Sequence, residues 1–497
     1  MKFQSTRNKN LRLDSAETIL KGLSDDGGLF VPVEIPVLKK GEIAKLSKLG
    51  YCERAKRIFA KFMTDFSEEE LLECAEKAYI GNFENEEPAP IVKLGESVYM
   101  LELWHGPTCA FKDMALQILP YFLVKSAEKA GDGKKTVILT ATSGDTGKAA
   151  LEGFCDVEGT EIIVFYPDNG VSKIQQLQMQ TQKGKNVAVC GVKGNFDDTQ
   201  TAVKTIFTDE KIRSELAENG KSFSSANSIN VGRLLPQVVY YISAYADLVA
   251  DGEIEDGETI NVTVPTGNFG NILAAYYAKR MGVPFGKLIC ASNANNVLTD
   301  FLSTGEYNVN REFFMTESPS MDILVSSNLE RLVFELCGKD DGYVREVMKS
   351  LREHREYHVP DEILGKIKET FAAGYTDDCG AENRIKMLFE EYSYLCDTHT
   401  AVAVEVYEKY KAETGDRTKT IIASTASPYK FPRAVLKSIS GANEADDFEA
   451  AKKIEVLSGL PMPKQLSELL EKEPRFTFVC EREEMAEFVL STVGGGC

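Results

Sequence analysis

Three segments of the chain combine residue types that could bind and activate a phosphorylated ligand. The first contains Lys112, which lies between Phe111 and the apolar stretch 114–119. A lysine sheltered in this way has a lowered pKa, which leaves part of its amine unprotonated and nucleophilic. Carbonyl cofactors are bound through such amines. Because a single lysine is usually a solvated surface residue, this prediction depends on the other two segments.

The second segment is the loop 140–148, which follows an apolar β-prone run and leads into a helical pattern. Its glycines let the backbone approach an anion, and Ser143 and Thr146 add hydroxyl donors. A nucleotide-binding loop would need glycine at the position of Thr142 and a hydroxyl residue at that of Ala149. The sequence therefore does not predict ATP binding. A simple tight turn between strand and helix stays open as the alternative to an anion site.

The third segment, 265–271, also lies between a predicted strand and a predicted helix. Its glycines and asparagines tolerate positive φ, and successive N–H groups of such a loop can converge on a phosphate. Separately, Arg233 lies in the first turn of a predicted helix, where its charge opposes the helix dipole. An anion is its expected partner, because arginine can bind phosphate through two parallel hydrogen bonds.

The composition limits the classes of partner. The formal net charge of −19, from 76 acidic and 57 basic residues, disfavours nucleic acid and anionic membranes as partners. An anionic substrate therefore requires a locally positive site. No apolar run approaches the roughly 20 residues of a membrane helix, and the start of the chain lacks the apolar core of a signal peptide. The 11 cysteines are scattered without a C-x-x-C pair, which predicts reduced thiols, a cytoplasmic location and no metal site.

Histidines offer alternative sites. His354 and His358 have the spacing of helical metal ligands, but Arg355 occupies the position where a zinc-protease motif has glutamate. We interpret the pair as part of a charged helix face. His105 lies near the Lys112 segment and could belong to the same site, whereas His399 is interpreted as a capping or packing residue.

The order of apolar runs predicts the domain organisation. Residues 1–90 resemble short helices around a glycine turn, and 301–395 are mostly helical and charged, as in an insertion. Strands alternate with helices over 91–300 and 396–440, which predicts an α/β core with a parallel sheet covered on both faces. Residues 441–497 are expected to pack on this core. The expected strands are 136–141, 161–166, 186–192, 259–264, 287–291 and 418–423, and the longest expected core helices cover 228–248 and 271–281.

Five motifs resemble the threonine synthase family, in its longer bacterial and fungal form, and occur in the family order. They are 105–116, 140–148, 227–235, 265–271 and 318–323. The similarity covers essentially the whole chain, from Thr6 and the turn 27–30 through to 424–431. It implies the tryptophan-synthase-β-like fold of pyridoxal phosphate (PLP) enzymes, fold type II. That fold would comprise two open α/β domains, with an N-terminal extension and a helical insertion.

The resemblance also implies roles for individual residues. Lys112 would be the catalytic lysine that carries PLP covalently. The other residues expected to bind the cofactor are Gly267, Asn268, Phe269 and Asn271 at its phosphate, Thr425 at the pyridine nitrogen, and Asp145 near its hydroxyl. The residues expected to bind the substrate are Ser143, Thr146, Asn227, Ser228, Asn230 and Arg233. The implied reaction converts O-phosphohomoserine and water into L-threonine and phosphate, in a monomer or homodimer that binds no metal.

One residue departs from the family pattern, because Ser427 stands where the family usually has histidine. Any substrate contact made by that histidine is in doubt here. Other enzymes of the same fold stay open, namely a threonine dehydratase or a phospholyase acting on an amino-alcohol phosphate. A non-catalytic PLP-binding protein is the alternative from another class. Arg233 favours a phosphorylated substrate over a dehydratase substrate.

Overall fold

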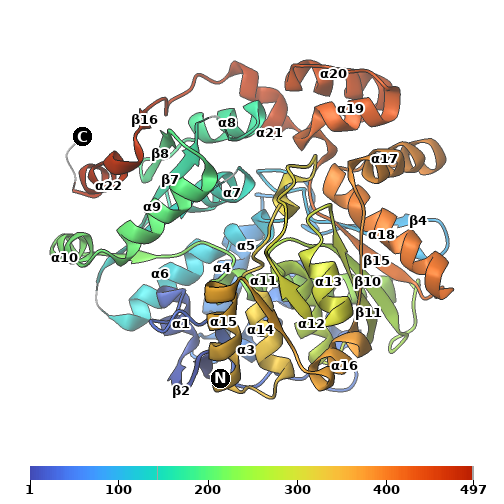
Figure 1. Ribbon diagram of the computed structural model, residues 1–497, viewed down its shortest axis with the longest axis horizontal. Coiled ribbons are helices and arrows are strands. Elements are labelled where there is room, and N and C mark those ends of the chain that lie inside the picture. Colours follow the sequence, from blue (N-terminus) through green and yellow to red (C-terminus); the bar gives the residue numbers. More distant parts are fainter. Residues whose placement is uncertain (132, 143, 169, 495–497) are drawn as a thin grey trace.

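Two open sheets, built from different parts of the chain, form the framework of the molecule (Figure 1). The computed structural model describes residues 1–494 except 132, 143 and 169. In Figure 1 the strands of the smaller sheet lie at the upper left and those of the larger sheet at the right, with α5 and α11 between them. The chain thus has a mixed α/β architecture with two sheet-based units, as the alternation of strands and helices predicted.

The larger sheet has six strands, which run parallel except for the β4–β5 pair. In order across the sheet they are β14 (Phe371–Tyr375), β11 (Phe285–Ser292), β10 (Ile260–Pro265), β15 (Thr420–Ser424), β5 (Val98–Glu102) and β4 (Ile91–Leu94). β10 and β15 are buried along their whole length. Strands covered on both faces are apolar without alternation, which is why these runs were recognisable in the sequence.

The chain between residues 231 and 467 contributes eleven α-helices. They are α11 (Val231–Ala250), α12 (Gly270–Arg280), α13 (Val297–Thr304), α14 (Leu329–Leu336), α15 (Asp341–His354), α16 (Asp361–Thr370), α17 (Asp378–Tyr392), α18 (Thr398–Thr414), α19 (Pro432–Ser440), α20 (Asp447–Ser458) and α21 (Lys464–Ser467). α18 packs on β10, β11 and β15. α11 is buried on nearly all sides, as expected for a core helix that is apolar around its circumference.

The smaller sheet has five parallel strands. They are β16 (Val479–Cys480), β8 (Val187–Val192), β7 (Thr160–Pro167), β6 (Lys135–Ala141) and β9 (Lys221–Ser224). The helices of this unit are α5 (Asp113–Leu116), α6 (Leu119–Ala130), α7 (Asp145–Phe154), α8 (Lys173–Gln180), α9 (Phe196–Thr208), α10 (Glu210–Glu218) and α22 (Met485–Val493). β16 shows that the end of the chain returns to a sheet begun by the first third.

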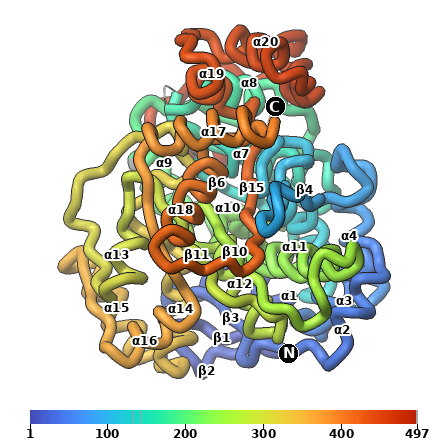
Figure 2. The backbone as a smooth tube through the Cα atoms, turned by 90° about the vertical axis from the view of Figure 1, so that its right-hand side faces the viewer, coloured from blue at the N-terminus to red at the C-terminus, as the bar shows by residue number. Residues whose placement is uncertain are grey.

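The N-terminal unit contains strands as well as the helices expected from the sequence. Its antiparallel sheet has the order β2 (Asn8–Leu13), β1 (Phe3–Ser5) and β3 (Phe30–Pro32), and its helices are α1 (Ser15–Lys21), α2 (Glu42–Leu46), α3 (Tyr51–Phe62) and α4 (Glu68–Tyr79). Phe59 of α3 stacks edge-on against Phe122 of α6 at 5.1 Å. The apolar side chains of this unit are therefore continuous with the core of the remaining chain. Figure 2 shows its strands at the opposite end of the molecule from α19 and α20.

The segment 301–395 differs from the expected helical insertion. β12 (Glu306–Asn308) and β13 (Glu356–His358) form a two-stranded antiparallel sheet, and β14 pairs in parallel with β11 at the edge of the larger sheet. β14 is the short sequence Phe-Ala-Ala-Gly-Tyr, which carries too few β-branched residues to be recognised as a strand. His354 ends α15 whereas His358 lies on β13, so the two do not share a helix face.

Candidate active site

Lys112 lies where loops from the two sheets meet. It precedes α5, and the backbone before it is held by a hydrogen bond from the Phe111 N–H to the Thr425 carbonyl of 2.8 Å. Only 11% of its side chain is exposed, and its Nζ lies 3.6 Å from Asp145 Oδ2 and 3.4 Å from Ser320 Oγ. Burial lowers the Lys112 pKa, and Asp145 partly opposes this effect. Burial thus favours the unprotonated form of the amine, which is the form that a nucleophile requires.

Two further cations act on the same amine. Arg233 and Lys430 both lower the Lys112 pKa through their charge. Lys430 is completely buried, and its Nζ lies 3.1 Å from Asp145 Oδ1 and donates to Gln178 Oε1 at 2.7 Å. One carboxylate therefore faces two lysines, with an arginine close by. This surplus of positive charge is the local exception that a chain of net charge −19 needs in order to hold an anion.

Asp145 is the first residue of α7 and the anionic centre of the cluster. Its carboxylate accepts hydrogen bonds from Gln175 Nε2 at 3.0 Å and from Ser320 Oγ at 3.3 Å. Burial alone would raise the Asp145 pKa, but Lys430 and Lys112 hold it well below its usual range. The group is therefore ionised at all ordinary pH values, and it acts as a fixed counterion.

The Thr142 side chain binds two backbone N–H groups at the start of α7. Thr142 Oγ1 accepts the N–H groups of Gly144 at 3.0 Å and Gly147 at 2.9 Å. These two donors are consequently not free for an anion. Thr146 is half-buried beside them, and Ser143 lies outside the described residues.

The loop between β10 and α12 has the features of a phosphate site. Phe269 has a φ of +59°, which lets the chain turn directly into the first turn of α12, whose N–H groups lack partners within the helix. The carbonyls of Gly267 and Asn268 are bound from outside, by Ser326 Oγ at 2.8 Å and Asn328 Nδ2 at 2.9 Å. These bonds fix the loop through its acceptors and leave donors for a ligand.

Asn271 adds a buried donor to this loop. Its Oδ1 accepts hydrogen bonds from Tyr240 at 2.8 Å and Tyr241 at 2.5 Å. Its Nδ2 is buried and has no partner in the described part of the chain. A buried donor without a partner costs roughly 1–3 kcal/mol, so an acceptor on a ligand is its expected partner. The loop therefore fits the phosphate of a bound cofactor.

The segment 227–233 supplies both structural and binding groups. Asn230 is the N-cap of α11: its Oδ1 accepts the Gly232 N–H at 2.9 Å and its Nδ2 donates to Ile19 O at 3.0 Å. Asn230 is completely buried, and both of its polar atoms are bonded within the protein. Its expected contact with the substrate stays a prediction. Asn227 and Ser228 are half-buried at the start of the segment, and Ser228 Oγ accepts from Asn328 Nδ2 at 3.4 Å.

Arg233 differs from Asn230 because its guanidinium is only partly satisfied. Nη1 donates to Ala226 O at 2.8 Å, whereas the buried Nε has no partner among the described residues. No carboxylate in the described part of the chain lies within 4.0 Å of this cation. Burial lowers the Arg233 pKa to about 10, with Tyr240 opposing this effect. An unpaired buried cation with a free N–H is well suited to bind an anionic group.

Thr425 and Ser427 support the Lys112 loop. The Thr425 N–H donates to Thr400 Oγ1 at 3.2 Å, and its carbonyl accepts from Phe111. Ser427 is buried and its Oγ accepts the Tyr429 N–H at 3.3 Å, so this departure from the family pattern acts as a local cap. The hydroxyl role expected of Thr425 stays a prediction.

His105 lies near the Lys112 segment but is bound elsewhere. Its Nε2 lies 2.7 Å from Glu102 Oε2 and its Nδ1 lies 3.2 Å from Glu84 Oε2. Burial would lower the His105 pKa, but these two carboxylates raise it to about 9. Both ring nitrogens are thus occupied, and neither is available to Lys112.

Sequence reasoning missed Lys430, Ser320 and the site position of His399. Lys430 follows an aromatic residue and precedes Phe431, the same kind of apolar setting that drew attention to Lys112. Ser320 lies in a motif that was recognised but given no role. His399 was interpreted as capping or packing, yet its Nε2 accepts the Ser320 N–H at 3.1 Å.

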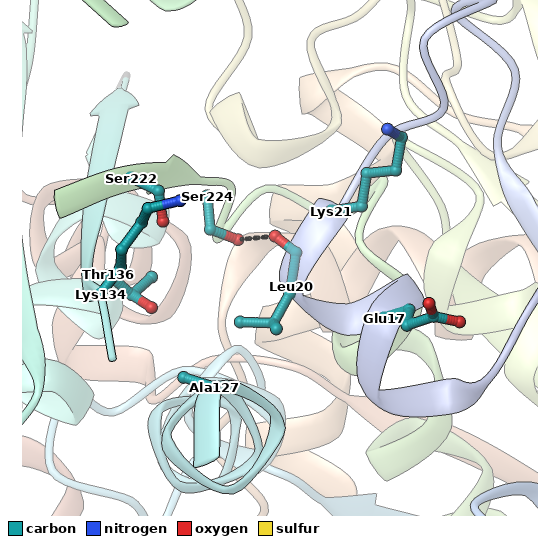
Figure 3. Close-up of a pocket in the computed structure, with 8 residues that line it drawn as sticks. All are labelled: Glu17, Leu20, Lys21, Ala127, Lys134, Thr136, Ser222 and Ser224. Carbon is teal, nitrogen blue, oxygen red and sulfur yellow. Dashed lines mark hydrogen bonds between the residues drawn. The ribbon is translucent and has the colours of Figure 1, made fainter. Parts of the chain in front are cut away.

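A separate pocket of about 270 Å³ lies away from this cluster (Figure 3). It is lined by Glu17, Leu20, Lys21, Ala127, Lys134, Thr136, Ser222 and Ser224. Ser224 Oγ donates to Leu20 O at 2.8 Å across it, and Figure 3 shows Glu17 turned away from the serines.

The described residues lack the features of two other kinds of site. No helix there is both long and apolar enough to cross a bilayer. No group of three or more His, Cys, Asp or Glu side chains in that part of the chain is arranged to hold a metal ion.

Comparison with known proteins identifies related families. Residues 2–79 match the threonine synthase N terminus, 84–425 the pyridoxal-phosphate dependent enzyme family, and 400–489 the threonine synthase C-terminal family. A threonine synthase of Pseudomonas aeruginosa is 35% identical over 96% of this chain and 95% of its own length. Human threonine synthase-like 1 is 41% identical over 85% of this chain, but the chain spans only 58% of that longer protein.

Solved structures agree with these relatives. A PLP-bound threonine synthase from Brucella melitensis superimposes with a TM-score of 0.88, at 34% identity and 99% coverage of both chains. The yeast threonine synthase gives a TM-score of 0.89 at 31% identity, covering 100% of this chain and 99% of that one. These likenesses confirm the predicted fold class. By its domains, its relatives and its fold, the chain belongs to the threonine synthase family of pyridoxal-phosphate-dependent enzymes.

Proposed function

We propose that this chain is a threonine synthase, which uses PLP to convert O-phosphohomoserine and water into L-threonine and phosphate. Two groups carry the proposal: the buried Lys112 amine, whose pKa is lowered, and the buried Arg233 guanidinium, whose Nε has no partner among the described residues. The first is the group that carbonyl cofactors need, and the second suits a phosphorylated substrate. The family membership and the PLP-bound relative support the same cofactor.

The residues present fit PLP. Asn271 Nδ2, which has no partner among the residues that the structure describes, and the first turn of α12 offer donors to its phosphate. Lys112 offers the amine for its aldehyde. We expect Gly267, Asn268 and Phe269 to complete the phosphate loop, and Thr425 and Asp145 to face the ring. When bound, PLP supplies an electron sink for negative charge at the substrate Cα.

The chain's own residues then orient the substrate and move protons. Lys112 is placed to take and return protons at Cα and Cβ of the substrate. Arg233, with Thr146, Asn227, Ser228 and Ser143 as further candidates, holds the phosphate that leaves from Cγ. Water adds at Cβ. Asp145, paired with Lys430, keeps the local charge balanced while Lys112 changes its protonation state.

A phospholyase is the second candidate. The human relative, at 41% identity, is named threonine synthase-like rather than threonine synthase. Ser427 also replaces the histidine usual in the family, so any substrate contact that the histidine makes is missing here. A phospholyase would release phosphate and form a keto acid instead of threonine.

Incubation of the PLP-loaded protein with O-phosphohomoserine tests the proposal. Threonine and phosphate released in equal amounts support the synthase, and phosphate with a keto acid supports the phospholyase. Absence of both products would contradict the proposal and favour a non-catalytic PLP-binding protein. Assays with threonine as substrate test for the dehydratase.

We also infer a cytoplasmic location and a monomer or homodimer. The ten cysteines in the described part of the chain are all free thiols, which supports a reducing compartment. Light scattering coupled to gel filtration would measure the oligomeric state.

A further inference from the structure

Ser320 lies at the centre of the Lys112 cluster and contacts several of its parts. Its Oγ lies 3.4 Å from Lys112 Nζ and 3.3 Å from Asp145 Oδ2. Its carbonyl oxygen packs so tightly on Gly267 that a Cβ at that glycine would lie 2.7 Å away. Ser320 therefore contacts the Lys112 amine, the Asp145 carboxylate and the phosphate loop. A small shift of Ser320 would change all three contacts.

His399 holds Ser320 in this place, and the geometry decides its tautomer. The Ser320 N–H points at His399 Nε2 at 3.1 Å, and a backbone N–H can only donate. Nε2 must therefore carry a lone pair. The ring proton is then on Nδ1, which donates to Asp397 Oδ2 at 2.6 Å.

Asp397 is completely buried and can only accept. Its carboxylate also accepts the N–H groups of His399 at 2.9 Å and of Thr400 at 3.1 Å. A simple helix cap, which Asp397 forms at the start of α18, would need only these backbone bonds. The additional bond to the imidazole is therefore unexplained by capping alone.

The Asp397–His399 pair is also connected to the backbone that holds Lys112 in place. Thr400 Oγ1 donates to Asp397 and accepts the Thr425 N–H at 3.2 Å. The Thr425 carbonyl in turn accepts the N–H of Phe111, the residue before Lys112, at 2.8 Å. Hydrogen bonds thus connect Ser320, through His399, and the backbone before Lys112, through Thr400 and Thr425, to the same buried carboxylate of Asp397.

We propose that Asp397 and His399 are positioning residues that fix Ser320 so that its hydroxyl aims the Lys112 amine. An amine held by defined partners reaches its target without a search through rotamers, and misplacement of reacting groups by about 1 Å can cost up to about 100-fold in rate. The inference rests on the proposed function only in taking Lys112 as the amine that receives PLP.

The first test measures the imidazole itself. The chain has four histidines, so the ¹⁵N spectrum of their rings is simple, and a His399→Gln variant assigns the signals of His399 by their loss. We expect a neutral ring with the proton on Nδ1. A proton on Nε2 would overturn the proposal. This measurement needs neither cofactor nor substrate.

The second test follows the covalent uptake of PLP by the cofactor-free protein through its absorbance. Ser320→Ala and His399→Phe should each slow uptake by about tenfold, and the double variant should be no slower than the worse single variant. His399→Gln keeps an acceptor near the position of Nε2 and should restore the rate to within about threefold.

An unchanged uptake rate in His399→Phe would overturn the proposal. So would a double variant whose rate is lowered by the product of the two single effects. Thermal unfolding of each variant separates positioning from loss of fold, since Ser320→Ala should leave the Tm unchanged. Because uptake requires no substrate, a failure of the threonine synthase assay would not affect this outcome. If the unaltered protein took up no PLP, the proposed function would fail. The tautomer measurement would still test the contact between His399 and Ser320.

Discussion

Replacing Arg233 by methionine should raise the stability of the cofactor-free protein while weakening its reaction with a phosphorylated substrate. A pKa change of one unit corresponds to about 1.4 kcal/mol. The fall of the Arg233 pKa from 12.5 to about 10 therefore places the cost of burying its charge at about 3 kcal/mol. Arg233→Met removes this cost, but it also loses the hydrogen bond to Ala226 O, which reduces the gain in stability by about 1 kcal/mol. The net stabilisation is about 2 kcal/mol, equivalent to a rise in Tm of a few degrees.

The effect on catalysis has the opposite sign. Charge-assisted hydrogen bonds of an arginine to phosphate contribute roughly 1.5–3 kcal/mol, which corresponds to a fall in kcat/KM of about 10- to 100-fold. In the PLP-loaded protein, where we expect the cofactor to occupy the loop before α12, inorganic phosphate should raise the Tm of the unaltered protein and leave that of Arg233→Met unchanged. Arg233→Lys keeps the charge but not the planar fork, and should show an intermediate kcat/KM.

Arg331 provides a matched control. Burial lowers its pKa to about 10 as well, but its guanidinium donates to Phe30 O at 3.0 Å, to Ile229 O at 2.6 Å and to Asn328 Oδ1. Arg331→Met leaves three acceptors without a donor and should lower the Tm. If Arg233→Met lowered the Tm as much, or left kcat/KM for O-phosphohomoserine unchanged, Arg233 would not be an anion-binding residue.

Three further predictions concern other residues. Lys112→Ala should abolish the absorbance of covalently bound PLP and turnover while the circular dichroism stays unchanged; turnover at the original rate would exclude its role. Gly267→Ala should weaken PLP binding by tenfold or more, because the new Cβ would lie 2.7 Å from Ser320 O. The control Gly365→Ala, on α16 with open space around it, should leave binding unchanged and raise stability by up to about 1 kcal/mol. The His105 pKa is raised from 6.5 to about 9, so its contribution to stability is complete below pH 6.5 and is lost as the pH rises through 9. After allowance for solvent screening this loss is about 1–2 kcal/mol, and it should be absent from the pH dependence of the Tm of His105→Gln.

The sequence predicted the strands that are buried on both faces better than any other element. The runs at 136–141, 161–166 and 259–264 correspond to β6, β7 and β10 within one or two residues. Such strands are apolar along their whole length, so their signal is local. β14 and the N-terminal strands were missed because they are short and lie at edges or in small sheets, where pairing rather than composition determines the conformation.

The same distinction applies to the candidate site. Loops that follow a strand and open a helix were found from their glycines, since phosphate sites need that local arrangement. The roles of Lys430, Ser320 and His399 were not found, because each depends on contacts with residues far away in the chain. Asn230 shows the converse limit: its neighbours suggested substrate binding, but its side chain is used to cap α11 and to hold Ile19. The direct roles assigned to the remaining site residues stay predictions.

The central place of β15 in the larger sheet has a consequence for the growing polypeptide on the ribosome. β5 and β4 leave the exit tunnel early, and β10 and β11 follow later, yet the strand that joins these two halves emerges only near residue 424. At ribosomal rates this interval is roughly tens of seconds. During it, β5 and β10 each expose an unpaired edge of the kind that recruits other strands and causes aggregation. Nascent chains stalled before β15 should therefore depend on chaperones, whereas chains released after it can close the sheet themselves.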